Sequence, residues 1–139
     1  MIDLLRRAPL HHVGVICPDR EQADFLLGLL GRRVRREYFV EAYRALCLFT
    51  DEGPTCIELV VPDGGPLVKH NRGAGGIHHI ALQVEDLRLE SDRLRKAGID
   101  LLEREPIDAG PIWINFISPI STRGLTIELV QPRPSQDGR

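Results

Sequence analysis

The sequence predicts an α+β fold made of two tandem βαβββ modules. Two internal matches lead to this prediction. Residues 11–31 align with residues 78–98 at a shift of 67 positions, without a gap. Residues 57–62 (IELVVP) return as residues 127–132 (IELVQP) at a shift of 70. Two matches in the same order with nearly equal shifts indicate the duplication of a unit of about 65 residues.

The first module begins with an apolar strand, expected at residues 10–17, and continues with a helix at residues 20–30. Asp19 lies where its carboxylate can accept hydrogen bonds from the free N–H groups of the first helical turn. Gly31 follows the helix at the position where a left-handed backbone ends it. Three more strands are expected at residues 32–40, 43–50 and 55–61.

The second module repeats this pattern with a strand at residues 77–84, a cap at Asp86 and a helix at residues 87–97. One face of the helix is defined at helical spacing, and Gly98 follows its end. This face is formed by Leu87, Ser91, Leu94 and Ala97. The remaining strands are expected at residues 101–105, 112–118 and 125–130.

The two modules are expected to form one domain over residues 1–139. Module 1 covers about residues 10–62, module 2 covers about residues 77–132, and a glycine-rich linker at residues 63–76 separates them. One helix covers only one face of a four-stranded sheet. The other face of each module therefore has to meet the second module or enclose a ligand.

The composition excludes several classes of function. The 139 residues carry a net charge of -2 and only 5% aromatic side chains, which disfavours binding to nucleic acid or to an anionic membrane. No apolar run approaches the ~20 residues of a membrane-spanning helix, and the first residues lack the apolar segment of a signal peptide. We therefore expect a cytoplasmic protein with reduced cysteines.

Strand alternation places two imidazoles and two carboxylates on one face. Neighbouring side chains of a strand point to opposite faces, so Glu58 and Glu128 oppose the aliphatic residues on either side of them. The same rule turns His12 and His79 away from the aliphatic side chains that belong under the helices. With pseudo-two-fold symmetry, these four side chains are expected to meet in a cavity.

The four side chains form a candidate metal site. A carboxylate inside an apolar strand is costly unless it is paired or bound to a metal, and here it occurs at two repeat-equivalent positions. Two imidazoles and two carboxylates suit an octahedral divalent ion such as Co, Ni, Mn, Zn or Fe. The alternative is a polar cavity in which these groups form His–Glu hydrogen bonds without a metal.

Over about residues 10–132 the chain resembles the vicinal oxygen chelate superfamily. The two histidine pairs and the two IELV strands carry the general likeness. This superfamily includes glyoxalase I, extradiol dioxygenases, fosfomycin-resistance enzymes, bleomycin-binding proteins and methylmalonyl-CoA epimerases. The likeness is greatest to the epimerases, and the motifs that carry it are residues 65–69, 76–81, 116–124 and 127–130.

The resemblance implies an open-barrel metal cavity and a set of functional residues. The metal ligands would be His12, Glu58, His79 and Glu128. The implied enzyme removes a proton α to a thioester carbonyl, through a metal-stabilised enediolate, and returns it on the opposite face. Glu41 and the metal-bound Glu128 would be the acid–base groups; a solvated turn residue is the alternative for Glu41.

The resemblance also implies a small-molecule substrate, such as a CoA thioester, and a homodimer, with no nucleic-acid or membrane partner. Two other functions stay open. One is a glyoxalase I-like lyase that acts on a thiol–aldehyde adduct. The other is a metal-poor protein that binds a small molecule such as an antibiotic.

Four further residues are candidates for contacting the substrate. Ser121 and Thr122 offer hydroxyl groups to a substrate carboxylate, with an ordinary turn as the alternative. Trp113 and Asn115 share one face of their strand and are expected to line the cavity, with core packing as the alternative for Trp113. His70 in the linker is interpreted as exposed rather than functional.

Overall fold

The computed structural model describes residues 5, 7–50 and 56–134. The chain divides into two compact units. The N-terminal unit comprises residues 11–80, and the C-terminal unit comprises residues 81–139 together with residues 1–10. Among the described residues, no helix has both the length and the apolar character that crossing a membrane requires.

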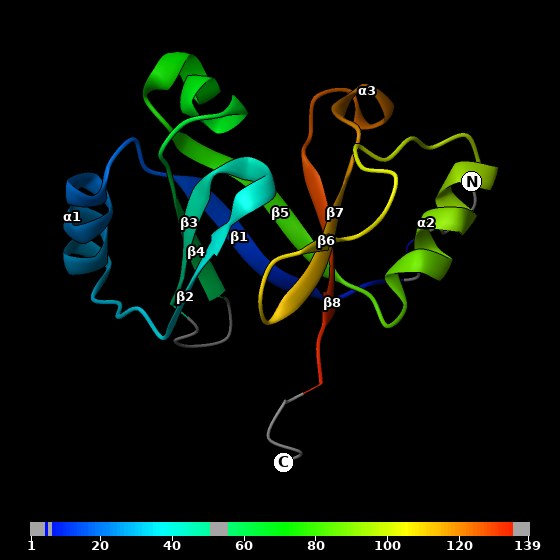
Figure 1. Ribbon diagram of the computed structural model, residues 1–139, viewed down its shortest axis with the longest axis horizontal. Helices are drawn as coiled ribbons and strands as arrows, with labels where there is room; N and C mark the ends of the chain where they lie inside the picture. The colour runs from blue at the N-terminus through cyan, green and yellow to red at the C-terminus, as the bar shows by residue number, and fades with distance from the viewer. Residues whose placement is uncertain (1–4, 6, 51–55, 135–139) are drawn as a thin grey trace. The chain divides into compact units, whose positions relative to one another are not determined.

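The N-terminal unit is a mixed sheet with one α-helix packed on it (Figure 1). Its elements are β1 (Leu10–Ile16), α1 (Arg20–Leu30), β2 (Arg36–Val40), the 3-10 helix η1 (Glu41–Tyr43), β3 (Ala45–Phe49), β4 (Cys56–Pro62), the 3-10 helix η2 (Pro66–Gly73) and the first part of β5 (Gly76–Gln83). The strands lie in the order β2-β3-β4-β1-β5. β1 runs parallel to β4, whereas the pairs β2–β3 and β3–β4 are antiparallel.

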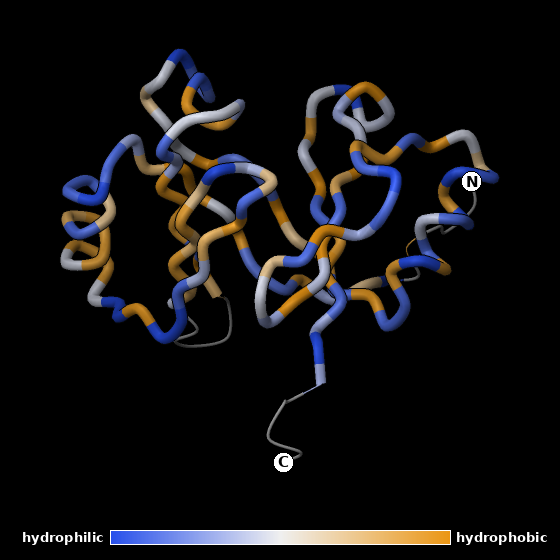
Figure 2. Tube along the Cα trace, in the orientation of Figure 1, coloured by the Kyte–Doolittle hydropathy of each residue, from blue (hydrophilic) through white to orange (hydrophobic). Residues whose placement is uncertain are grey.

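The core of this unit lies between α1 and the sheet. Its buried centre consists of Cys17, Ala23, Leu48 and Leu59. The other aliphatic residues of β4 that share the face of Leu59 pack against the same cluster, which turns Glu58 to the opposite face. Figure 2 shows the hydrophobic residues along β3 and β4.

The C-terminal unit has the same layout. It contains the end of β5, α2 (Leu87–Lys96), β6 (Ile107–Asp108), β7 (Ile112–Ile117), the short helix α3 (Pro119–Thr122) and β8 (Ile127–Pro132). Its strand order, β5-β8-β7-β6, matches the order β1-β4-β3-β2 of the first module. The buried cluster associated with α2 consists of Val84, Leu87, Leu94, Ile117 and Leu129.

The two modules share backbone hydrogen bonds at repeat-equivalent positions. The Cys17 N–H donates to the Val60 carbonyl at 2.8 Å, and the Val84 N–H donates to the Val130 carbonyl at the same distance. These bonds tie the end of the first strand of each module to its last strand. The predicted α+β class and the two βαβββ modules are therefore confirmed.

The two helices also begin in the same way. Asp19 and Asp86 each accept a hydrogen bond from the backbone N–H three residues ahead, at 2.8 and 3.1 Å. Gly31 ends α1 with a φ of 64°, and Gly98, with a φ of 86°, follows α2. Both predicted aspartate caps are confirmed.

Several predicted element boundaries differ from the structure in the first module. The linker at residues 63–76 contains η2, and the strand expected at residues 32–40 begins only at Arg36. The strand expected at residues 43–50 begins at Ala45, because η1 and the left-handed backbone of Arg44, with a φ of 51°, precede it. Thr55, the expected first residue of the next strand, lies outside the described residues.

The strand predicted at residues 101–105 is wrong. Leu101 forms only an isolated bridge to Ile117, and the corresponding strand is β6. The reason is Asn115, whose buried side chain accepts a hydrogen bond from the Glu103 N–H at 3.1 Å and donates one to the Glu103 carbonyl at 2.9 Å. These bonds satisfy the backbone groups that a neighbouring strand would otherwise pair.

Candidate metal centre

Two histidines and a glutamate converge inside the N-terminal unit. His12 lies on β1, Glu58 on β4 and His79 on β5. The two histidine Nε2 atoms are 3.1 Å apart, and Glu58 Oε1 lies 3.3 Å from His12 Nε2 and 3.4 Å from His79 Nε2. The exposed fractions of His12, Glu58 and His79 are 0%, 5% and 4%. The structure thus brings together three of the four predicted ligands in one buried cluster.

The backbone of β1 makes room for the His79 ring at Gly14. A Cβ atom added to Gly14 would lie 2.0 Å from His79 Cε1 and 2.4 Å from His79 Nε2, well inside van der Waals contact. Gly14 also lies opposite Glu58 in the β1–β4 register. Gly14 was not predicted from the sequence as a site residue. The signal that the sequence offered was the repeat, which has an alanine, Ala81, at the equivalent position.

Each of the two histidine rings also contacts residues outside the cluster. The ring of His12 meets that of Phe49 edge-on, with centroids 5.6 Å apart. His12 Nδ1 lies 2.7 Å from His11 Nδ1, and His79 Nδ1 lies 2.8 Å from His78 Nδ1. These contacts leave the Nε2 side of each ring directed at Glu58.

The environment keeps the Glu58 carboxyl group ionised. Burial alone raises its pKa, but hydrogen bonds and charge interactions with His12 and His79 outweigh burial and hold the pKa well below its ordinary value. A buried carboxylate therefore lies beside two imidazole nitrogens. This set of groups can bind a cation when the ligating nitrogens carry no proton.

The separations fit three ligands of one metal ion. Two ligand atoms ~2.1 Å from a metal and at right angles to each other are ~3 Å apart. The observed separations of 3.1, 3.3 and 3.4 Å are close to this value. Imidazole nitrogen together with carboxylate oxygen is a donor set that suits divalent transition metals. The cluster of His12, Glu58 and His79 is therefore a candidate divalent metal site.

The fourth predicted ligand, Glu128, lies on β8 in the C-terminal unit and is also buried. Ile127 and Leu129 on either side of it pack with the α2 cluster, so Glu128 points to the other face of its strand. It lies opposite Phe116 in the β7–β8 register, as Glu58 lies opposite Phe49. Its role as a ligand stays a prediction.

The predicted acid–base residue Glu41 is the first residue of η1, and its side chain is exposed. Ser121 and Thr122 lie on α3. Ser121 Oγ accepts a hydrogen bond from the Asp100 N–H at 3.1 Å, and the Thr122 hydroxyl donates to the Leu125 carbonyl. These bonds stabilise the turn around α3, and the proposed contacts of the three residues with substrate stay predictions.

Trp113 and Asn115 lie on the face of β7 that belongs to α2. Trp113 packs against the α2 cluster, and the Arg133 guanidinium lies 3.9 Å from its ring centroid. Asn115 is fully buried and holds the backbone of Glu103. Phe116 is the β7 residue that lies opposite Glu128. Trp113 and Asn115 point to the other face of β7 from Phe116, so they face away from the Glu128 carboxylate. Their contacts are those of core residues, and their contact with substrate stays a prediction.

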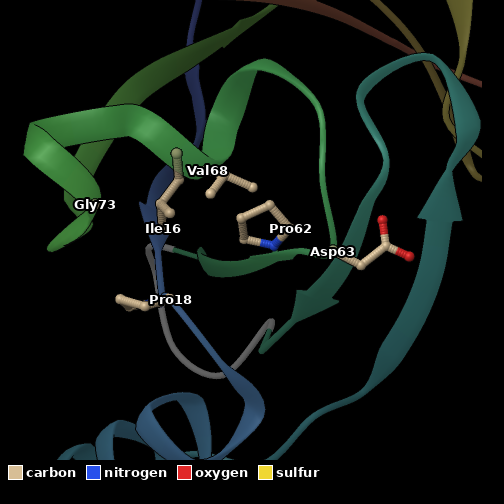
Figure 3. Close-up of a pocket in the computed structure, with 6 residues that line it drawn as sticks. All are labelled: Ile16, Pro18, Pro62, Asp63, Val68 and Gly73. Atoms are coloured by element: carbon tan, nitrogen blue, oxygen red, sulfur yellow. The ribbon is translucent and has the colours of Figure 1, made fainter.

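An open pocket of about 320 Å³ lies elsewhere in the N-terminal unit (Figure 3). It is lined by Ile16, Pro18, Pro62, Asp63, Val68 and Gly73. None of these six described residues is a predicted site residue. The one charged side chain, Asp63, forms an ion pair with Arg44 at 3.0 Å. This pocket therefore does not compete with the buried cluster as the candidate site.

Comparison with known proteins identifies the family. The model of the Glyoxalase/Bleomycin resistance protein/Dioxygenase superfamily matches residues 11–116. An ethylmalonyl-CoA/methylmalonyl-CoA epimerase of Cereibacter sphaeroides is 34% identical over 129 residues, which cover 88% of this chain and 96% of that protein. The mitochondrial methylmalonyl-CoA epimerase of Homo sapiens is 32% identical over 130 residues, which cover 88% of this chain and 73% of that protein.

The fold agrees with these sequence matches. The crystal structure of methylmalonyl-CoA epimerase from Mycobacterium tuberculosis matches with a TM-score of 0.83 at 26% identity, covering 94% of this chain and 91% of that chain. Both the superfamily resemblance and the likeness to epimerases that the motifs predicted are thereby confirmed. The chain belongs to the Glyoxalase/Bleomycin resistance protein/Dioxygenase superfamily, also known as the vicinal oxygen chelate superfamily, and its relatives include methylmalonyl-CoA epimerases.

Proposed function

We propose that this chain is a metal-dependent epimerase of the methylmalonyl-CoA type. It removes the proton α to the thioester carbonyl and returns a proton on the opposite face. The observation that carries this proposal is the buried convergence of His12, Glu58 and His79 at separations of 3.1 to 3.4 Å. Relatives with 30 to 34% identity that bear the name methylmalonyl-CoA epimerase support the choice of reaction.

His12, Glu58 and His79 would hold the metal, and we assign Glu128 as the fourth ligand. Support for Glu128 comes from its burial and from its repeat-equivalence to Glu58. When bound, a divalent cation supplies positive charge that stabilises the negative charge developing on the carbonyl oxygen. Co, Ni, Mn, Zn and Fe are all compatible with the donor set.

Inversion at the α-carbon needs two proton-transfer groups, one on each side of the substrate. In this proposal Glu41 is one group, and Glu128 is the other. A carboxylate accepts the α proton from one face, and a carboxylic acid on the other face returns a proton. The exposed position of Glu41 makes its carboxylate accessible to a small molecule. The hydroxyls of Ser121 and Thr122 would bind the substrate carboxylate.

Deuterium exchange tests the proposal. The protein is loaded with Co²⁺, its metal content is measured, and methylmalonyl-CoA is added in deuterated water. Mass spectrometry should show incorporation of one deuterium at the α-carbon, together with equilibration of the two epimers. A sample that holds about one metal ion per chain and shows no exchange would contradict the proposal. A thiol–aldehyde adduct assayed in parallel separates this activity from that of a lyase.

A matched pair of variants tests the acid–base assignment. Glu41 follows β2, and Glu37 is an exposed carboxylate within the same strand. The Glu41→Gln variant should lose exchange while it keeps its metal content and thermal stability, because only proton transfer is removed. The Glu37→Gln variant should keep the exchange rate. The opposite pattern would move the role from Glu41 to Glu37.

The homodimer expected from the resemblance is proposed as the state in solution. Light scattering on a sizing column measures it directly. A mass twice the 15.6 kDa of one chain is the expected result.

A further inference from the structure

We propose that His11 and His78 are positioning residues that hold the imidazole rings of His12 and His79 with both Nε2 atoms toward the metal. This inference rests on the metal site proposed above and adds an outer layer of side chains to it. Each of the two outer histidines directly precedes its ligand in the sequence. The duplication therefore supplies an outer histidine to both modules.

The contact between outer and inner histidine is the same in both modules. The two Nδ1 atoms are 2.7 Å apart in the pair of His11 and His12, and 2.8 Å apart in the pair of His78 and His79. The rings cross at 76° in the first pair and at 87° in the second. Both outer rings are half-buried, whereas both inner rings are buried. Such agreement between the two modules indicates that the contact is a feature of the repeated unit.

The chemistry of imidazole decides which partner donates the proton. A hydrogen bond between two ring nitrogens contains one proton, so one Nδ1 atom donates and the other accepts. A histidine that ligates through Nε2 carries its proton on Nδ1. His12 and His79 are therefore the donors. His11 and His78 accept at Nδ1, and their own protons lie on Nε2.

This contact holds the ligand ring in one orientation. Metal-binding histidines usually donate their second N–H to a carboxylate, a carbonyl or water. Here a neutral imidazole takes that role, so the ring is oriented without a further negative charge beside the Glu58 carboxylate. The outer histidines are expected to act through the ligands and not on the substrate.

His70 supports this layer in the second pair. Its ring meets that of His78 edge-on, with centroids 4.9 Å apart, and its Nε2 lies 3.1 Å from the Ile77 carbonyl oxygen. The interpretation of His70 as an exposed linker residue is therefore incomplete, since it is half-buried against His78. The linker helix η2 thus contributes a side chain to the surroundings of the site.

Metal affinity in variants of the outer pair is the first test. The His11→Leu and His78→Leu variants should each bind Co²⁺ about 10- to 100-fold more weakly in chelator competition, because the inner Nδ1–H loses the acceptor that the outer ring provides. The His11→Asn and His78→Asn variants should recover most of this affinity, because the asparagine Oδ1 can accept at nearly the position of Nδ1. Leu10→Ala and Ile77→Ala serve as matched controls, because these exposed neighbours lie at repeat-equivalent positions.

Two outcomes would overturn the proposal. One is a leucine variant that binds Co²⁺ as tightly as the unaltered protein. The other is an asparagine variant that loses as much affinity as the leucine variant, which would mean that the outer ring only fills space. Failure of the unaltered protein to bind Co²⁺ is a separate result, and it would overturn the metal site itself.

A spectroscopic measurement on the unaltered protein keeps the test valid if the variants fold poorly. The Zn²⁺-loaded, ¹⁵N-labelled protein is studied by nitrogen NMR. The inner histidines should show a protonated Nδ1 with scalar coupling across the hydrogen bond to the outer Nδ1. The outer histidines should show protonated Nε2. A protonated Nδ1 on His11 or His78 in the Zn²⁺-loaded protein would refute the assigned roles.

Discussion

The Gly14→Ala variant tests how closely the proposed metal site depends on the absence of a side chain at this position of β1. The new Cβ would lie 2.0 Å from His79 Cε1, 2.4 Å from Nε2 and 2.6 Å from Nδ1. An ordinary contact begins near 3.4 Å, so the imidazole ring must retreat by about 1.4 Å or the strand must bend. Three atoms of the imidazole ring meet the new methyl group, so the contact is not confined to one edge atom.

This displacement is large compared with the geometry of the site. His79 Nε2 lies 3.1 Å from His12 Nε2 and 3.4 Å from Glu58 Oε1, and a shift of more than 1 Å removes it from the position of a ligand. We expect Co²⁺ affinity to fall by more than about 10-fold. Overpacking of this kind should also cost about 1–3 kcal/mol in the free energy of unfolding, or roughly 4 °C in Tm for each kcal/mol.

Chelator competition and thermal unfolding measure these two effects. Gly28→Ala is the matched control, because Gly28 is exposed on α1 and a Cβ there meets nothing within 4 Å. It should keep the metal affinity and gain about 0.5–1 kcal/mol, since alanine is the better helix former. If Gly14→Ala bound Co²⁺ as tightly as the unaltered protein, the close approach of His79 to β1 would not be a requirement of the site.

Three further predictions concern single side chains. The Asn115→Ala variant should lose about 2–4 kcal/mol of stability in urea unfolding, because the Glu103 N–H and carbonyl lose their partner; an unchanged midpoint would contradict this role. Burial, with a smaller contribution from the charge of Asp19, raises the pKa of the Cys17 thiol. Alkylation of the native protein at pH 8 should therefore modify the half-buried Cys56 before Cys17. Equal rates of alkylation at the two cysteines would refute this order. The Glu58→Gln variant should bind Co²⁺ more weakly than the unaltered protein but better than Glu58→Ala, because the amide keeps one oxygen ligand and loses the charge; equal affinities of the two variants would show that this oxygen is not a ligand.

Sequence periodicity was sufficient to place Glu58 on the face of β4 that points away from α1. Ile57 and Leu59 pack in the α1 cluster, and this alone turns Glu58 to the other face of β4. The duplication then linked His12 with His79, which lie 67 residues apart in the chain and have Nε2 atoms 3.1 Å apart. Alternation combined with an internal repeat thus predicts long-range proximity, because each copy constrains the other.

The same reasoning could not predict features that depend on a single side chain-to-backbone bond. Residues 101–105 have the apolar start expected of a strand. In the structure the Asn115 amide binds both backbone groups of Glu103, and Arg95 donates to the carbonyls of Glu103 and Arg104. A pattern of apolar residues does not reveal that a side-chain amide takes the place of a neighbouring strand as the backbone's hydrogen-bond partner. The strand predicted at residues 101–105 is therefore wrong.

Periodicity also does not predict how much space separates a side chain from the backbone of a neighbouring strand. Gly14 and Ala81 occupy equivalent positions in the repeat, and both fit an apolar strand. Ala81 is fully buried with its methyl group in place, whereas a methyl group at Gly14 would overlap the ring of His79. The two modules are therefore no longer interchangeable at this position, because only the first must accommodate the imidazole of the other strand. Gly14 lies on β1, the strand that also contributes the proposed ligand His12 and its outer histidine, and its bare backbone receives the ring of the second proposed ligand.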